Sequence, residues 1–193
     1  MIIDISQEVF SCNVFPGDPA PVRSILSSIE NGAVCNLTAF SMCAHNGTHV
    51  DAPFHFIQNG KTIDRVPLDV FIGPCWVERH DGLVTGEDAA VILGKAHEQG
   101  VRRRILIAGK ATVTEEAAKV FAEQGVWLVG NESQTVGPEN APKRVHDILL
   151  GSGAVLLEGI VLADVDEGRY TLHAAPLNLG GSDGAPCRAY LVK

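Results

Sequence analysis

The chain has 193 residues, of which 46% are hydrophobic and 20% charged, and its formal net charge is −8. This length suffices for one hydrophobic core, so we expect a single domain over residues 1–193. The acidic balance disfavours nucleic acid as a partner, and the absence of a long apolar run disfavours a membrane-spanning protein.

The first part of the chain is predicted to form short strands. Residues 2–5 and 22–28 have strand patterns, and the turn-rich stretch at residues 15–19 separates them. Residues 36–42 alternate polar and apolar side chains, which predicts a half-buried strand. The amino terminus has no basic segment followed by an apolar stretch, so we expect no signal peptide and a cytoplasmic location.

The middle of the chain alternates helix and strand signals. A capping box at Thr85 opens a helix that ends near Gly100, and a strand at residues 104–108 follows. Thr114 caps a second helix, which precedes a strand at residues 126–129. This order predicts parallel strands joined by crossover helices.

The last part is predicted to be mostly strands. Pro142 can occupy the first turn of a short helix that ends near Leu150. Beyond it, Gly and Asp turns separate apolar runs at residues 154–157, 159–162, 170–179 and 189–192. The fold class that follows is α/β, with a single mixed-sheet domain.

Four side chains that can bind metal lie within eleven residues, at His45, His49, Asp51 and His55. Imidazole and carboxylate ligands suit Zn²⁺ or Mn²⁺. A straight strand would separate His45 and Asp51 by about 20 Å, so we expect the chain to bend at Gly47. Any one of these histidines is equally well explained as a surface or capping residue, but the cluster of four favours a metal site.

The run His-x-Gly-Thr-His-x-Asp-x-Pro-x-His at residues 45–55 resembles the signature of the metal-dependent cyclase-like hydrolases, which include bacterial kynurenine formamidases and isatin hydrolases. The resemblance implies a swivelling β/β/α fold and metal-dependent hydrolysis of a small amide, lactam or related acyl bond. It also implies a homodimer or homotetramer, in which the Phe15 loop would reach a neighbouring subunit. It extends to residues 15–18, 130–133, 157–159 and 181–186.

The same resemblance implies five ligands for one or two divalent ions: His45, His49, Asp51, His146 and Glu158. The last two stand twelve residues apart, which is the family's spacing. His55 would be the proton donor and acceptor. Without the resemblance, His146 is an ordinary helix histidine and Glu158 is a strand-end acid. However, a carboxylate that directly follows an apolar strand is costly unless charged partners or a metal compensate it.

Departures from the family pattern concern the substrate. Phe15 stands where kynurenine formamidases have a tryptophan, which reduces the aromatic stacking area. Asn131 and Glu132 replace the usual pattern before Ser133. We predict that Phe15 and Ser133 contact the substrate, and Gln134 is a further candidate for such a contact. Both N-formylkynurenine and an isatin-like lactam stay open as substrates. Asp183 is most simply an Asx-turn residue, and the alternative is that it lines the site.

Two other classes of protein are considered. A metal- or ligand-binding protein without catalysis would keep the ligands but lack a productive pocket. A cysteine hydrolase is disfavoured, because none of the five cysteines lies in a recognisable nucleophile motif. Their odd number and the lack of a CxxC pair also argue against a disulfide framework and a thiolate zinc site.

Overall fold

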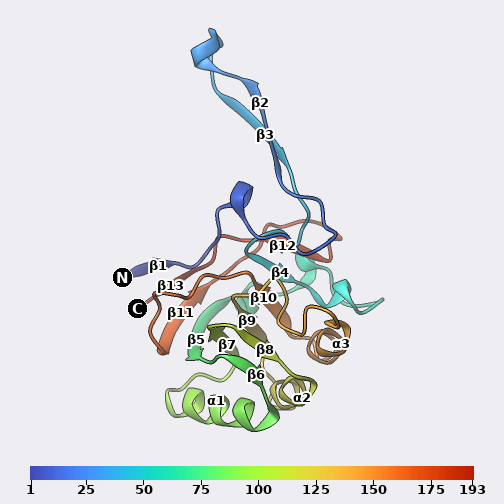
Figure 1. Ribbon diagram of the computed structural model, residues 1–193, viewed down its shortest axis with the longest axis vertical. Coiled ribbons are helices and arrows are strands. Elements are labelled where there is room, and N and C mark those ends of the chain that lie inside the picture. The colour runs from blue at the N-terminus through green and yellow to red at the C-terminus, as the bar shows by residue number, and fades with distance from the viewer.

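Nine strands form one mixed sheet in the computed structural model, which describes residues 1–193 (Figure 1). The strand order is β1-β13-β11-β5-β7-β9-β10-β4-β12. Four consecutive strands of this order run parallel to one another: β5 (Ile72–Arg79), β7 (Arg104–Ala108), β9 (Leu128–Asn131) and β10 (Val155–Glu158). The predicted α/β class and parallel crossovers are confirmed.

Three helices connect these parallel strands and lie on one side of the sheet (Figure 1). They are α1 (Gly86–Glu98), α2 (Glu115–Glu123) and α3 (Lys143–Gly151). The side chain of Thr85 caps α1 in a capping box, and that of Thr114 caps α2. These caps satisfy amide groups that a helix start leaves unpaired, which is why the predicted helix starts are correct.

The outer strands are antiparallel to their neighbours. On one side they are β11 (Gly168–His173), β13 (Tyr190–Val192) and β1 (Ile2–Asp4), so the two chain ends lie side by side (Figure 1). On the other side they are β4 (His49–Asp51) and β12 (Gly184–Pro186). Two further short strands, β6 (Gly82–Val84) and β8 (Ala111–Val113), form a separate parallel pair.

Each face of the sheet carries its own hydrophobic core. Along β7, Ile105 and Ile107 pack in the core that contains the helix residues, whereas Leu106 and Ala108 pack in the core on the opposite face. This division follows from the two-residue period of a strand. A continuous apolar run therefore fits a strand that is buried on both faces.

A long hairpin stands away from the rest of the molecule (Figure 1). Its strands are β2 (Val22–Ser27) and β3 (Leu37–Ser41), and both were expected from the sequence. The expected half-burial of β3 is wrong, because four of its five residues are exposed. Alternation of polar and apolar residues indicates that a strand has one polar and one apolar face. It does not show that the apolar face is buried by other residues of the same chain.

Other predicted boundaries differ from the structure. The predicted strand at residues 159–162 is not part of the sheet, and β9 begins two residues later than predicted. No helix is long and apolar enough to cross a membrane. Five single 3-10 turns complete the structure: η1 (Val9–Ser11), η2 (Ile29–Asn31), η3 (Pro53–His55), η4 (Ile63–Arg65) and η5 (Leu68–Val70).

Candidate metal centre

The short strand β4 carries two of the predicted ligands. Gly47, with a φ of +61°, precedes it, and Pro53 begins η3 after it, so the chain turns on both sides of β4. The predicted bend is therefore confirmed. His49 and Asp51 lie two residues apart and thus on the same face of β4. The antiparallel register places Glu158, the last residue of β10, directly opposite His49.

Two imidazoles and two carboxylates surround one buried centre. The Nε2 atom of His49 lies 3.3 Å from Asp51 Oδ1 and 3.5 Å from Glu158 Oε2. The Nε2 atom of His146 lies 3.3 Å from Glu158 Oε1 and 3.6 Å from Asp51 Oδ2. All four side chains are at most 3% exposed. The structure thus brings together residues that lie about a hundred positions apart in the sequence.

The remaining ring nitrogens fix the orientation of both imidazoles. His49 Nδ1 donates to the carbonyl of Gly47 at 2.9 Å, and His146 Nδ1 donates to the carbonyl of Pro142 at 2.9 Å. A carbonyl only accepts, so Nδ1 holds a proton and Nε2 is the atom available to a metal. Glu158 is held in a similar way, because its Oε1 accepts the backbone N–H of Val136 at 2.8 Å.

The electrostatics of the centre favour positive charge. Burial opposes protonation of His49 and His146, but Asp51 and Glu158 outweigh it and raise the pKa of each imidazole to about 10. Burial likewise opposes ionisation of Asp51, but the neighbouring imidazoles of His146, His45 and His49 hold its pKa well below its usual range. A divalent cation would supply the same positive charge in place of the imidazole protons.

The geometry of these side chains fits a metal better than a hydrogen-bonded network. Asp51 Oδ2 is buried and has no hydrogen-bond partner. The Nε2 to carboxylate separations of 3.3 to 3.6 Å around the centre are long for charge-assisted hydrogen bonds. The fifth predicted ligand, His45, lies beside this group, with its Nδ1 2.7 Å from Asp51 Oδ1. Imidazole nitrogens and carboxylate oxygens are suitable ligands for Zn²⁺ and Mn²⁺.

Asp183 contacts two histidines of the site, although its sequence context favoured an Asx turn. Its Oδ2 lies 3.0 Å from His45 Nε2 and 3.2 Å from His55 Nδ1. The Asx-turn interpretation missed this, because the contact depends on β12 pairing with β4, where Gly184 lies opposite Asp51. Burial lowers the pKa of His55, so its ring is neutral at neutral pH and able to accept a proton.

A cavity of about 410 Å³ opens beside the centre, a volume that suits a small molecule. Phe15 and Phe56 line it. Ser133 does not line it. The Ser133 hydroxyl accepts the backbone N–H of Thr135 at 3.4 Å, and the residue lines a separate cavity. The two following residues, Gln134 and Thr135, line the metal pocket instead.

Comparison with known proteins agrees with this arrangement. Residues 3–138 match the model of the family described as "Putative cyclase". A kynurenine formamidase of Paracidovorax citrulli is 36% identical over 99% of this chain and 96% of its own length. Another kynurenine formamidase, from Salinibacter ruber, is 34% identical over 98% of this chain and 96% of its own length.

Solved structures have the same fold. A potential metal-dependent hydrolase with cyclase activity superimposes with a TM-score of 0.83 and 27% identity, over 99% of this chain and 96% of that one. Isatin hydrolase A from Labrenzia aggregata superimposes with a TM-score of 0.83 at 23% identity, over 99% and 93% of the two chains.

The fold and the buried His/Asp/Glu centre, together with these relatives, define a hydrolytic enzyme of the metal-dependent class. The chain belongs to the "Putative cyclase" family.

Proposed function

We propose that this chain hydrolyses a small amide, with a divalent metal held by His49, Asp51, His146, Glu158 and His45. The observation that carries the proposal is the alternation of two imidazoles with two carboxylates around one buried centre, beside a cavity of about 410 Å³. When bound there, Zn²⁺ or Mn²⁺ supplies Lewis-acid chemistry that polarises an acyl carbonyl and acidifies water.

His55 performs the proton transfers in this proposal. Its side chain is 27% exposed at the edge of the centre, so substrate and water can reach it. When Nδ1 donates to Asp183, Nε2 is left as the basic nitrogen. His55 takes a proton as water adds to the carbonyl carbon and gives it to the amine as the C–N bond breaks. Water and the amide become a carboxylic acid and an amine.

The relatives favour an aryl formamide as substrate, because they are named kynurenine formamidases. N-formylkynurenine is therefore the first substrate to test, with an isatin-like lactam as the alternative. Phe15 and Phe56 line the cavity and offer two aromatic side chains for an aryl group.

The test compares metal content with activity. Elemental analysis should find Zn or Mn in the purified protein, and N-formylkynurenine or isatin should be hydrolysed. His55→Ala should keep the metal and reduce kcat/KM by at least about a hundredfold. The double variant His146→Ala, Glu158→Ala should lose both metal and activity. A metal-containing wild type that hydrolyses no amide, lactam or ester would instead support a binding protein without catalysis.

We also propose that the chain forms a homodimer through its hairpin. The hairpin exposes apolar side chains that no other part of the chain covers: Ile25 (67%), Leu26 (61%), Ile29 (58%), Val34 (100%) and Leu37 (51%). The total accessible surface of 9747 Å² exceeds by about 900 Å² the roughly 8,800 Å² typical of a monomer of 20.5 kDa. That excess is close to the roughly 800 Å² that each partner buries in a standard interface.

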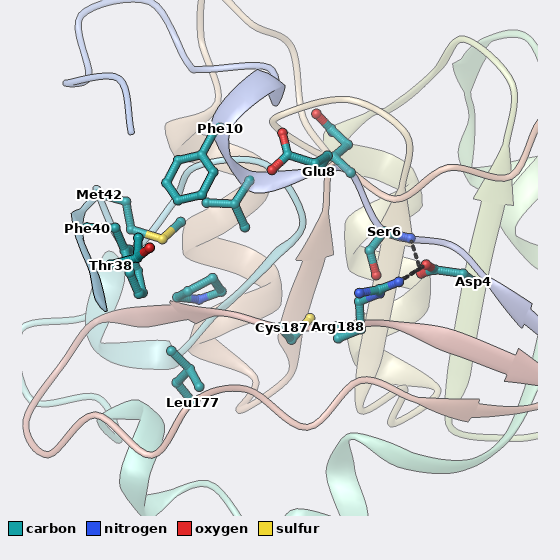
Figure 2. A pocket seen from close by; sticks show the side chains of 13 residues that line it. Asp4, Ser6, Glu8, Phe10, Thr38, Phe40, Met42, Leu177, Cys187 and Arg188 are labelled. Atoms are coloured by element: carbon teal, nitrogen blue, oxygen red, sulfur yellow. Dashed lines mark hydrogen bonds and ion pairs between the residues drawn. The ribbon is translucent and has the colours of Figure 1, made fainter. Parts of the chain in front are cut away.

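The surface that would receive the partner's hairpin is the groove in Figure 2. It has a volume of about 730 Å³, and the apolar side chains of Phe10, Phe40, Met42 and Leu177 line it. The groove lies where the hairpin joins the sheet, so a two-fold axis can place each hairpin on the groove of the other copy.

The measurement is molar mass in solution by light scattering. Wild type should have about twice the chain mass of 20.5 kDa. Ile25→Glu combined with Leu26→Glu should reduce the mass to that of one chain, because two buried charges oppose association. The control is Leu83→Glu, which changes an apolar residue that is 64% exposed on β6, outside the hairpin. A monomeric wild type, or a hairpin variant that stays dimeric, would contradict the proposal.

A further inference from the structure

The amide of Gln134 is buried beside the metal centre without a hydrogen-bond partner. Neither its Nε2 nor its Oε1 contacts a donor or acceptor of the chain, and both atoms are closed to solvent. The hydroxyl of its neighbour Thr135 is unpaired in the same way. Six buried side-chain atoms lack a partner in the whole chain, and these two residues, which line the metal pocket, contribute three of them.

The surroundings of Gln134 explain why its amide has no hydrogen-bond partner within the chain. The amide lies against Gly159, where a Cβ atom would be 2.2 Å from Gln134 Nε2. The carbonyl of Gly159, the nearest obvious acceptor, already accepts from Gln7 Nε2 at 2.8 Å and from Thr48 Oγ1 at 2.6 Å. The missing side chain at Gly159 therefore makes room for the amide, but no group there pairs with it.

An unpaired buried amide is costly, so a protein that keeps one has a use for it in another state. Gln134 as a residue is partly exposed although both terminal atoms are buried. The atoms of Gln134 that are exposed in this structure are thus not those of its terminal amide. No hydrogen bond within the chain holds the amide in place, so turning it into the pocket breaks none.

We propose that the Gln134 amide turns to the bound substrate and pairs with its amide group, so that the enzyme selects amides and lactams over esters and lactones. A primary amide has a donor and an acceptor side by side. It matches the N–H and C=O of a lactam, or of a formamide in its cis form, at two points. An ester lacks the N–H, which leaves Oε1 unpaired in a buried site. This inference rests on the proposed amide hydrolysis and narrows its substrate class.

The kinetic test uses formanilide and phenyl formate, which differ in the N–H. Gln134→Met keeps the side-chain length and removes both hydrogen-bonding atoms. It should reduce the ratio of kcat/KM for the amide to kcat/KM for the ester by about tenfold to a hundredfold. Gln58→Met, the same change at an exposed position, should leave the ratio unchanged. An equal loss for both substrates, or no loss, would overturn the proposal.

A second measurement separates this inference from the proposed hydrolysis. In the metal-loaded His55→Ala variant, the side-chain ¹⁵N–¹H₂ resonances of Gln134 are assigned by their absence after Gln134→Met. Benzamide should shift them, whereas methyl benzoate should not. If wild type hydrolyses nothing but benzamide shifts these resonances, the function fails and the amide-recognition role stands. If neither compound shifts these resonances, or if both shift them equally, the proposed role of Gln134 is wrong, whether or not the enzyme hydrolyses amides.

Discussion

His45 and His55 stack against each other, with ring centroids 4.0 Å apart and ring planes 25° apart. Two stacked imidazoles repel when both are charged. Asp183 contacts both, and with Asp51 it favours the protonated form of His45. The ring of His55, whose pKa is lowered by burial, therefore lies beside a ring whose pKa is raised by two carboxylates, and Asp183 contacts both.

Asp183→Asn should lower kcat about tenfold or more, because the neutral amide orients His55 less strongly. KM and metal content should stay near the wild-type values, since Asp183 is not among the five predicted ligands. Steady-state kinetics measure kcat and KM, and elemental analysis measures the metal content. Asp164→Asn, at an exposed position, is the matched control. A variant with unchanged kcat would show that Asp183 has no positioning role.

Metal binding should stabilise the fold. A free metal concentration of one hundred times Kd should add about 2.7 kcal/mol. For a chain of this size, this raises Tm by roughly 5 to 10 °C relative to protein treated with a chelator. The double variant His146→Ala, Glu158→Ala should show no such shift in a thermal unfolding assay. A metal-dependent shift that persists in this variant would place the ion elsewhere.

Gly159→Ala should be strongly destabilising. At Gly159, φ is +64°, and a Cβ would lie 2.2 Å from Gln134 Nε2 and 2.3 Å from the carbonyl oxygen of Gly47. The left-handed backbone and the clash together should cost about 3 to 5 kcal/mol. Gly153→Ala has the same sign of φ but no neighbour within 4 Å, so it should cost only about 1 to 2 kcal/mol. Urea unfolding compares the two, and equal effects would contradict the predicted clash.

Thiol alkylation should separate the cysteines by burial. Burial raises the pKa of Cys75 to about 12, so only about one thiol in ten thousand is ionised at pH 8. Its reaction with iodoacetamide should remain negligible from pH 7 to 9, whereas the exposed Cys35 should react. Peptide mass spectrometry identifies the sites, and activity should survive modification of Cys35. Loss of activity on modification of a single cysteine would revive the cysteine-hydrolase alternative.

Local signals explain which parts of the fold could be predicted. The starts of α1 and α2 depend on caps within four residues, so the sequence contains all the information needed. Strand β5 was not predicted, although it lies near the middle of the sheet. It contains Gly73 and Pro74, which disfavour strands locally, and its pairing with β11 and β7 outweighs this preference.

Some residues of the site could likewise be predicted from the sequence, and others could not. The spacing within residues 45–55 could be recognised directly, and the resemblance supplied His146 and Glu158. The contact of Asp183 with His45 and His55 was not the favoured interpretation, because it depends on the long-range pairing of β12 with β4. Of the two neighbouring residues expected to contact the substrate, Ser133 and Gln134, only Gln134 lines the metal pocket.

The pairing of His49 with Glu158 makes metal affinity a measure of strand register. A slip of one residue between β4 and β10 would place Leu157 opposite His49 and turn the Glu158 carboxylate to the other face of the sheet. Such a misfolded chain could be compact and still lack a complete ligand set. Metal added during refolding at a concentration below that of the protein should therefore bind to and stabilise the correctly paired chains selectively. In this way the metal ion would also favour the correct strand register.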